Sequence, residues 1–433
     1  MARAVKKYIK KIRPHRRGPQ QKADAKSFAF LLKILFELLP ASDQLDSTEI
    51  PRNEILEMLH CCLLCRNIYK KEAKRYLPPN LSNIVYESQE SDYFIIPYFI
   101  VNSDELDTIF VVFRGSYCLK DFIVDFMAST VSYRNGKAHE GIYLTSYNMF
   151  NRIKKRVRKL SRMNNNRKVI ITGHSLGAAV ASMVVDMFYE EDERKSENSS
   201  QTSFTTDYSA DDQVNHENFE SDEDLESSEN LEYRIEDEEH LFFDLKCICF
   251  APVASYSREN LEATKLHTRS YSTDGDFVPH VSFYNAISIS DDQLPALFKK
   301  ELDKAIRKKL NIHGDKFEPT VSQILENRVE YLTNPYPLYP PGDCYQIKMT
   351  DEHHSTIELM KIDDSTEYFG KFVKDLNEFR HMISCYNAWV IKYFVDNFQD
   401  QPDLIEYYDF MAKKKKQRKE IAEAPEYEEE YVD

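Results

Sequence analysis

The stretch VIITGHSLGAAVASMVV, Val169–Val185, places two of the ten glycines of this 433-residue chain around one serine. Its first residues, Val169–Thr172, are apolar or β-branched and predict a buried strand, whereas the alanine-rich residues Ala178–Val185 predict a helix packed on a sheet. The turn between them reads G-x-S-x-G, and a serine on such a turn is lifted clear of the sheet above the positive end of the helix dipole. We therefore interpret Ser175 as a nucleophile; the alternative is an ordinary serine in a glycine-flanked turn.

A serine nucleophile requires hydrogen-bond donors for the negatively charged oxygen that forms when it attacks a carbonyl group. The segment TIFVVFRGSYCLKDFIVDF, Thr108–Phe126, begins as a strand of β-branched and aromatic residues and leaves that strand sharply at Gly115. The N–H of Ser116 is one predicted donor, and the N–H of Leu176, directly after the nucleophile, is the other. His174, directly before the nucleophile, is expected to pack or to donate a hydrogen bond.

Several motifs follow one another in an order that resembles the class 3 lipase family. They are FRGS, AHEGIYLTSY (Ala138–Tyr147), GHSLGAA and DGDFVP (Asp274–Pro279). Two further segments, FAPVAS (Phe250–Ser255) and LYPPGDCYQI (Leu338–Ile347), resemble the branch of sn-1-specific diacylglycerol lipases. The resemblance extends over residues 93–395. It implies an α/β-hydrolase fold with a mostly parallel central sheet, a Ser-Asp-His triad that works through an acyl-enzyme, and no metal or organic cofactor.

The carboxylate of such a triad is expected in the segment RSYSTDGDFVPHVSF. The family pattern has an acid two residues before Val-Pro, which selects Asp276; Asp274 fits a loop-capping residue better. Residues Cys247–Phe250 and Thr268–Ser272 predict successive strands of a parallel sheet, and ligands bind just beyond the carboxyl ends of such strands. Asp276 would accept the Nδ1–H of the catalytic histidine and fix its orientation.

The chain order of the triad requires a histidine after Asp276. We predict His381, in the turn that opens the last long helix, after strands expected around Asp343–Lys348 and Thr356–Lys361. The family has its base at this place, usually behind an acid or another histidine where this chain has Arg380. The other histidines after Asp276 are His280, His313, His353 and His354. Of these, His353 and His354, in a predicted hairpin, are the main alternatives.

The acidity of the chain is concentrated in one segment. The net charge is −15, and residues 190–240 alone hold twenty Asp and Glu against three Lys and Arg. This segment has few large apolar residues to offset the entropy of ordering, so we expect a disordered acidic insertion. It is either a tolerated surface loop or a regulatory flap phosphorylated at Ser221, Ser227 or Ser228.

Composition divides the chain into four parts. We expect a basic disordered arm over residues 1–26, a helical extension over 27–90, an α/β-hydrolase domain over 91–400 and a charged tail over 401–433. Within the domain, residues 290–335 predict helices that form a cap or simply cover the core.

The N-terminal part of the chain has two features of a membrane-surface segment. Residues 1–23 hold nine Lys and Arg and no acid, and Ser27–Leu39 follows as a short apolar helix. A basic arm followed by such a helix is typical of peripheral contact with an anionic membrane, although a disordered arm and a core-covering helix explain it equally well. Tyr117–Val131 corresponds to the lid region of the family, whose apolar residues could face lipid.

The remaining features concern location and partners. Eight cysteines show no disulfide framework and the chain opens with no secretory segment, which favours a cytoplasmic location. Cys61, Cys62 and Cys65 cluster on a predicted helix without a second cluster at ligand spacing, so we expect no metal site. The basic runs lack interleaved aromatic residues, so we expect no nucleic-acid partner.

Together these observations predict a serine hydrolase that cleaves fatty acyl esters of glycerolipids, as a diacylglycerol or triacylglycerol lipase does. Two alternatives remain open. The same triad serves a phospholipase A1 or a lysophospholipase, and a catalytically inactive lipase-like scaffold could use its charged segments to recruit partners. The presence of a serine, an aspartate and a histidine in the required order argues against the scaffold.

Overall fold

The structure, a computed structural model, describes residues 45–70, 72–92, 94–115, 130–202, 243–280, 336–350, 356–371, 376 and 380–408. Several predicted features lie outside these ranges: the basic arm and the apolar segment after it, Ser116 with most of the lid region, most of the acidic insertion, the cap, most of the charged tail, and His313, His353 and His354. Within the described ranges, no helix combines the length and the apolar character needed to cross a membrane.

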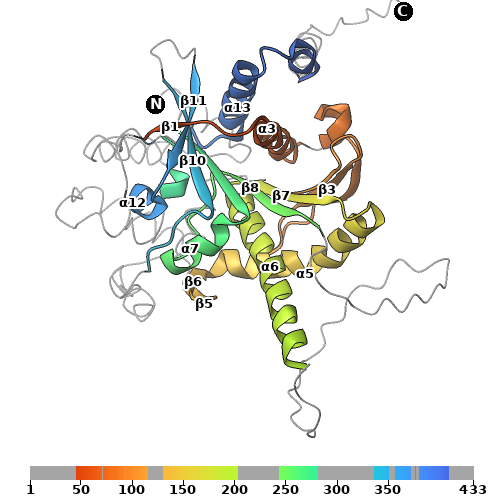
Figure 1. Cartoon of the computed structure of the whole chain (residues 1–433), viewed down its shortest axis with the longest axis vertical. Coiled ribbons are helices and arrows are strands. Elements are labelled where there is room, and N and C mark those ends of the chain that lie inside the picture. The colour runs from red at the N-terminus through yellow and green to blue at the C-terminus, as the bar shows by residue number, and fades with distance from the viewer. Residues whose placement is uncertain are drawn as a thin grey trace, which may run out of the picture.

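Among the residues described, nine strands form a central sheet (Figure 1), with the strand order β1-β11-β10-β9-β8-β7-β4-β3-β2. Its five central strands are parallel: β4 (Thr108–Phe113), β7 (Lys168–His174), β8 (Leu245–Phe250), β9 (Thr268–Thr273) and β10 (Asp343–Met349). Antiparallel strands extend both edges: β3 (Tyr98–Ser103) and β2 (Ile84–Ser88) on one, β11 (Ile357–Ile362) and β1 (Ser47–Thr48) on the other.

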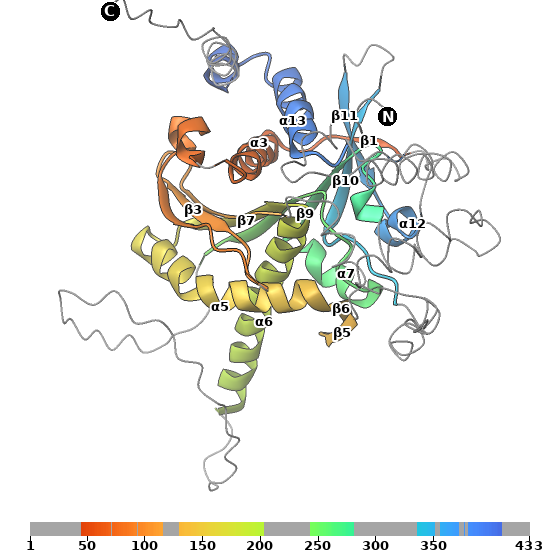
Figure 2. The same cartoon turned by 180° about the vertical axis from the view of Figure 1, so that it is seen from behind.

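Helices cover both faces of this sheet, as Figures 1 and 2 show from opposite sides. One face carries α5 (Glu140–Met163), α6 (Leu176–Thr202) and α7 (Arg258–Lys265), and the other carries α3 (Arg52–Asn67) and α13 (Ile383–Asn397). The parallel strands are therefore buried on both sides, which explains why β4 is apolar at every position after Thr108 rather than at alternate positions. This layered, mostly parallel arrangement confirms the α/β-hydrolase fold class expected from the sequence.

Shorter elements complete the described fold. The strands β5 (Thr130–Tyr133) and β6 (Gly136–His139) form a hairpin beside α5. The single-turn helices are η1 (Ala73–Tyr76), η2 (Pro79–Leu81) and η3 (Val278–His280), and α12 (Ser365–Phe369) follows β11. The carboxylate of Asp364 caps α12 by accepting from the Thr366 and Glu367 N–H groups.

The sheet includes residues that the sequence analysis placed outside the hydrolase domain. β2 lies within the expected helical extension and pairs with β3, so the sheet begins before residue 91. Of that extension, α3 is helical and packs against α13 under the sheet. The strands predicted at Cys247–Phe250 and Thr268–Ser272 are confirmed as the parallel neighbours β8 and β9.

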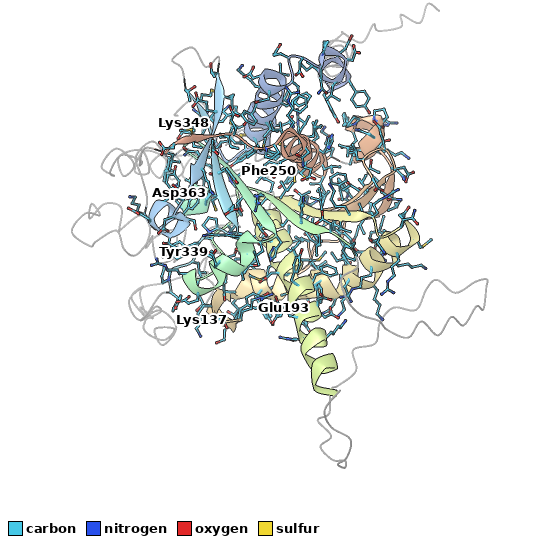
Figure 3. The ribbon with its side chains drawn as sticks, viewed as in Figure 1. Lys137, Glu193, Phe250, Tyr339, Lys348 and Asp363 are labelled. Carbon is cyan, nitrogen blue, oxygen red and sulfur yellow. The ribbon has the colours of Figure 1, made fainter. Side chains whose placement is uncertain are left out.

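The expectation of disorder is wrong for the first part of the acidic segment. α6 continues to Thr202 and projects beyond the sheet (Figure 1). Ion pairs one helical turn apart stabilise this projection, from Arg194 to Glu190 at 2.7 Å and from Lys195 to Glu191 at 3.0 Å. Figure 3 places Glu193 on the same part of α6, and its carboxylate pairs with Arg134 beside β5 at 3.2 Å. The charged tail is likewise helical over residues 402–408.

Buried histidines predict that acid will destabilise this fold. Burial lowers the pKa of four of them, to about 3 for His60 and His174 and to about 4 for His139 and His280. Below about pH 6.5 the unfolded chain therefore binds more protons than the folded one, and the free energy of unfolding falls by up to about 1.4 kcal/mol per histidine and pH unit. We expect the urea midpoint to drop between about pH 6.5 and about pH 4. A constant midpoint over this interval would contradict the burial of these rings.

Candidate active site

Ser175 occupies a strained turn between β7 and α6. Its φ of 61° lies in the left-handed region, which is unfavourable for residues other than glycine. The main chain on both sides holds it there: the Ser175 N–H donates to the Phe250 carbonyl at 2.9 Å, and the Ser175 carbonyl accepts from the Ala178 N–H at 3.0 Å. Phe250 ends β8 and is labelled near the centre of Figure 3. The turn is thus fixed by the neighbouring strand as well as by its own helix.

The two glycines of the motif allow three elements to approach one another closely. A Cβ atom added to Gly173 would lie 2.3 Å from the main chain of Gly177, and one added to Gly177 would lie 2.5 Å from the Phe113 carbonyl oxygen. Neither residue can become alanine unless β7, α6 or β4 moves. The spacing of the motif therefore follows from the packing of a helix start between two parallel strands.

The three predicted triad residues form one hydrogen-bonded row. Nε2 of His381 is 2.9 Å from Oγ of Ser175, and Nδ1 of the same ring is 3.2 Å from Oδ2 of Asp276. Ser175 and Asp276 are buried, whereas the His381 side chain is 12% exposed. In this geometry a proton can pass from the serine hydroxyl to Nε2 while the carboxylate holds the opposite side of the ring.

Asp276 reaches this row because of the turn that follows β9. Gly275 in that turn has a φ of 77°, and the Asp276 N–H donates to the Thr273 carbonyl at 2.9 Å. Asp274, the other acid of the segment, accepts instead from the side-chain amide of Gln346 at 3.3 Å. The structure therefore brings Asp276, and not Asp274, to His381.

The surroundings of Asp276 keep it ionised. Burial alone raises the pKa of this carboxyl, but His381 beside it and hydrogen bonds from Tyr386 and the Val278 N–H lower the pKa below its usual value. The Tyr386 hydroxyl donates to Oδ2 at 2.5 Å and the Val278 N–H donates to Oδ1 at 2.9 Å. A carboxylate held in this way stabilises an imidazolium on His381.

Sequence reasoning missed Tyr386, which contacts Asp276 from α13. Its hydroxyl also accepts from the Thr273 N–H at 3.0 Å, and its buried ring meets the Phe250 ring edge to face at 6.1 Å. Nothing local in the sequence marks this tyrosine, because its partners lie 110 and 113 residues away along the chain.

Replacing Tyr386 with phenylalanine removes one hydrogen bond from the Asp276 carboxylate and little volume. A hydrogen bond to a charged group contributes about 1.5 kcal/mol, so we expect an approximately tenfold loss in kcat on an ester substrate with KM little changed. Tyr189→Phe is the matched control. The Tyr189 hydroxyl, on α6, donates to the Leu245 carbonyl of β8 at 2.8 Å and not to a triad residue. Equal activity of the two variants would contradict a contribution of Tyr386 to the site.

The predicted oxyanion donors are described in part. Leu176 begins α6, where main-chain N–H groups have no partner within the helix. Among the described residues, no hydrogen bond engages the Leu176 N–H. Ser116, the other predicted donor, lies outside the described residues and follows Gly115 at the end of β4.

Arg380 stands where the family usually has an acid or a second histidine. Its guanidinium lies over the ring of Trp389 at 4.5 Å, and its carbonyl accepts from the Thr273 hydroxyl at 2.8 Å. These two contacts fix the main chain directly before His381 to α13 and to the end of β9.

The other described histidines have different partners. His280 has Nδ1 2.9 Å from the Lys371 carbonyl and packs against the rings of Tyr368 and Phe369. His139 accepts from the Ile142 N–H at 3.3 Å and so caps α5.

Metal-binding residues do not gather in the described part of the chain. No group of three or more His, Cys, Asp or Glu side chains there could hold an ion. Cys61, Cys62 and Cys65 are free thiols on the buried face of α3, and Cys65 contacts the Thr172 hydroxyl at 3.4 Å.

Comparisons with known proteins show that part of this chain is similar to a lipase family. The family described as Lipase (class 3) matches residues 110–219, a range that contains the turn at Ser175. A lipase of Rhizomucor miehei is 34% identical over 104 residues, which cover 23% of this chain and 28% of that relative's length. The resemblance to class 3 lipases indicated by the motifs is therefore confirmed for this part of the chain.

Solved lipase structures also align with the chain. The Rhizomucor miehei triacylglyceride lipase does so with a TM-score of 0.46 and 16% identity, covering 78% of this chain and 96% of that one. The Lip2 lipase of Yarrowia lipolytica aligns with a TM-score of 0.43 and 11% identity, covering 82% of this chain and 97% of that one.

Proposed function

We propose that this protein is a serine hydrolase that cleaves fatty acyl esters of glycerolipids, as a diacylglycerol or triacylglycerol lipase does. The observation that carries the proposal is the hydrogen-bonded row of Ser175, His381 and Asp276 at a strained turn on the carboxyl edge of a parallel sheet. Each side chain has the chemistry that acyl transfer requires, and the distances suit proton transfer.

The reaction follows from these positions. Ser175 Oγ bonds to the ester carbonyl carbon while its proton passes to His381 Nε2, and Asp276 stabilises the resulting imidazolium. The N–H groups of Leu176 and Ser116 hold the negatively charged oxygen. The bond to the glycerol oxygen then breaks, and His381 gives that oxygen its proton. Water, activated by His381, attacks the acyl-enzyme, and the fatty acid leaves as Ser175 recovers its proton.

Apolar side chains beside His381 support a fatty acyl substrate. The ring of Phe277 lies 6.1 Å from the His381 ring and is only partly buried. Met382, the next residue after His381, is 43% exposed. The class 3 lipase match favours a lipid ester, and the motifs Phe250–Ser255 and Leu338–Ile347 favour a diacylglycerol.

The substrate class is tested by measuring fatty acid release from mixed micelles. The wild-type protein and Ser175→Ala are assayed on diacylglycerol, triacylglycerol, phosphatidylcholine and lysophosphatidylcholine. We expect serine-dependent release that is fastest from a neutral glyceride. Faster release from either phospholipid would make the protein a phospholipase A1 or lysophospholipase, and the absence of release that depends on Ser175 would favour the inactive scaffold.

A further inference from the structure

Tyr69 lies outside the central sheet and contacts the chain where two of its strands, β4 and β7, end. It lies in the turn after α3, and its hydroxyl oxygen accepts from the Gly115 N–H at 3.1 Å, where β4 has just ended. The same hydroxyl lies 3.4 Å from Nδ1 of His174, the last residue of β7. The two aromatic rings meet edge to face with centroids 6.3 Å apart.

The partners of His174 fix the direction of these hydrogen bonds. Nε2 of His174 is 2.8 Å from the main-chain carbonyl oxygen of His381, which can only accept, so Nε2 carries the proton. Burial and, to a smaller extent, the adjoining His381 lower the pKa of His174 to about 3, so the ring is neutral. Nδ1 is then an acceptor, and the Tyr69 hydroxyl donates to it while accepting from Gly115.

A neutral His174 ring does not repel a positive charge on the neighbouring His381 ring. The His174 and His381 rings are 4.8 Å apart, and the Tyr386 ring lies 5.7 Å from His174. A charged His174 would repel the imidazolium that His381 must become, and Asp276 is the nearby anion that favours charge on His174. Because the Tyr69 hydroxyl donates a hydrogen bond to Nδ1, it disfavours a second proton on the His174 ring.

The end of β4 is equally constrained. A Cβ atom on Gly115 would lie 2.3 Å from the His174 carbonyl oxygen and 2.8 Å from the Tyr69 hydroxyl oxygen. Only glycine fits this gap, so Tyr69 and β7 together constrain the main chain at Gly115.

We propose that Tyr69 is a positioning residue for the active site: one hydroxyl holds both the end of β4 that leads to the oxyanion donor Ser116 and the imidazole of His174 that supports the main chain of His381. This proposal rests on the proposed hydrolase function. Tyr69, in the turn after α3, then contributes to catalysis without contacting the substrate.

The test compares Tyr69→Phe with the wild type in two assays. One is the rate at which a fluorophosphonate probe labels Ser175, and the other is kcat and KM on a soluble short-chain ester. Misplacement of reacting groups lowers kcat rather than binding, so we expect labelling and kcat to fall about tenfold while KM changes less than about twofold. His174→Phe removes the Nδ1 acceptor that faces the Tyr69 hydroxyl, together with the Nε2–H that donates to the His381 carbonyl. In that background, Tyr69→Phe should cost less than it does in the wild type.

Tyr408→Phe is the matched control. Its buried hydroxyl bonds to His60 of α3 and to Asn80 at 3.2 Å, away from the triad. An unchanged labelling rate in Tyr69→Phe, or an equal loss in both tyrosine variants, would overturn the positioning proposal alone. A wild-type protein that takes no label, or a Ser175→Ala variant that does, would overturn the hydrolase function and with it the proposal.

Discussion

Ser175→Ala should lower kcat for ester hydrolysis about a million-fold, to the level that substrate binding and the oxyanion donors alone sustain. The hydroxyl supplies the only nucleophile in the hydrogen-bonded row, and alanine leaves nothing to accept the acyl group. The measurement is fatty acid release at saturating substrate, with the thermal midpoint recorded for each protein.

Ser182→Ala is the matched control for this substitution. Ser182 is buried in the same helix, α6, about two helical turns beyond Ser175. We expect this variant to keep the wild-type kcat. Substantial activity in Ser175→Ala, or its loss in Ser182→Ala as well, would contradict a nucleophilic Ser175.

Asp276→Asn should lower kcat about ten-thousand-fold while the protein stays folded. The amide has nearly the same shape as the carboxylate, but it carries no charge to stabilise the His381 imidazolium and can present an N–H to Nδ1. That contact would favour the wrong tautomer of His381, with its proton facing Ser175. The measurement is kcat on the same ester substrate.

Asp274→Asn provides a close control for the aspartate. It lies two residues away in the same turn and contacts Gln346 rather than His381. The triad geometry predicts that this change leaves kcat within about twofold of the wild type. The assignment of Asp276 would fail if the two variants lost similar activity.

The nucleophile turn could be predicted from sequence because its determinants are local. A buried strand, two glycines and a small-residue helix are contiguous, and the structure adds only why each glycine is needed. The family pattern selected Asp276 over Asp274, and its place just beyond a parallel strand agrees with that choice, because such an acid lies at the sheet edge where β7 also ends. His381 required the family resemblance, since five histidines satisfied the chain order.

The supporting residues could not be predicted because their partners are distant in sequence. Tyr69 and Tyr386 are ordinary aromatic residues of helix ends and faces until the fold brings them to His174 and Asp276. The edge strand β2 was missed for another reason: it has only five residues, with partial burial on one face. The start of the acidic segment was misread because ion pairs along α6 stabilise a helix that composition alone disfavours.

The most direct test of the central claim is to locate a covalent adduct. The wild-type protein is treated with a fluorophosphonate, digested, and mapped by mass spectrometry beside His381→Ala. The account predicts one adduct, on Ser175, and its near-complete loss when the histidine that activates the serine is removed. An adduct on a different residue, or labelling of Ser175 that is indifferent to His381, would contradict it.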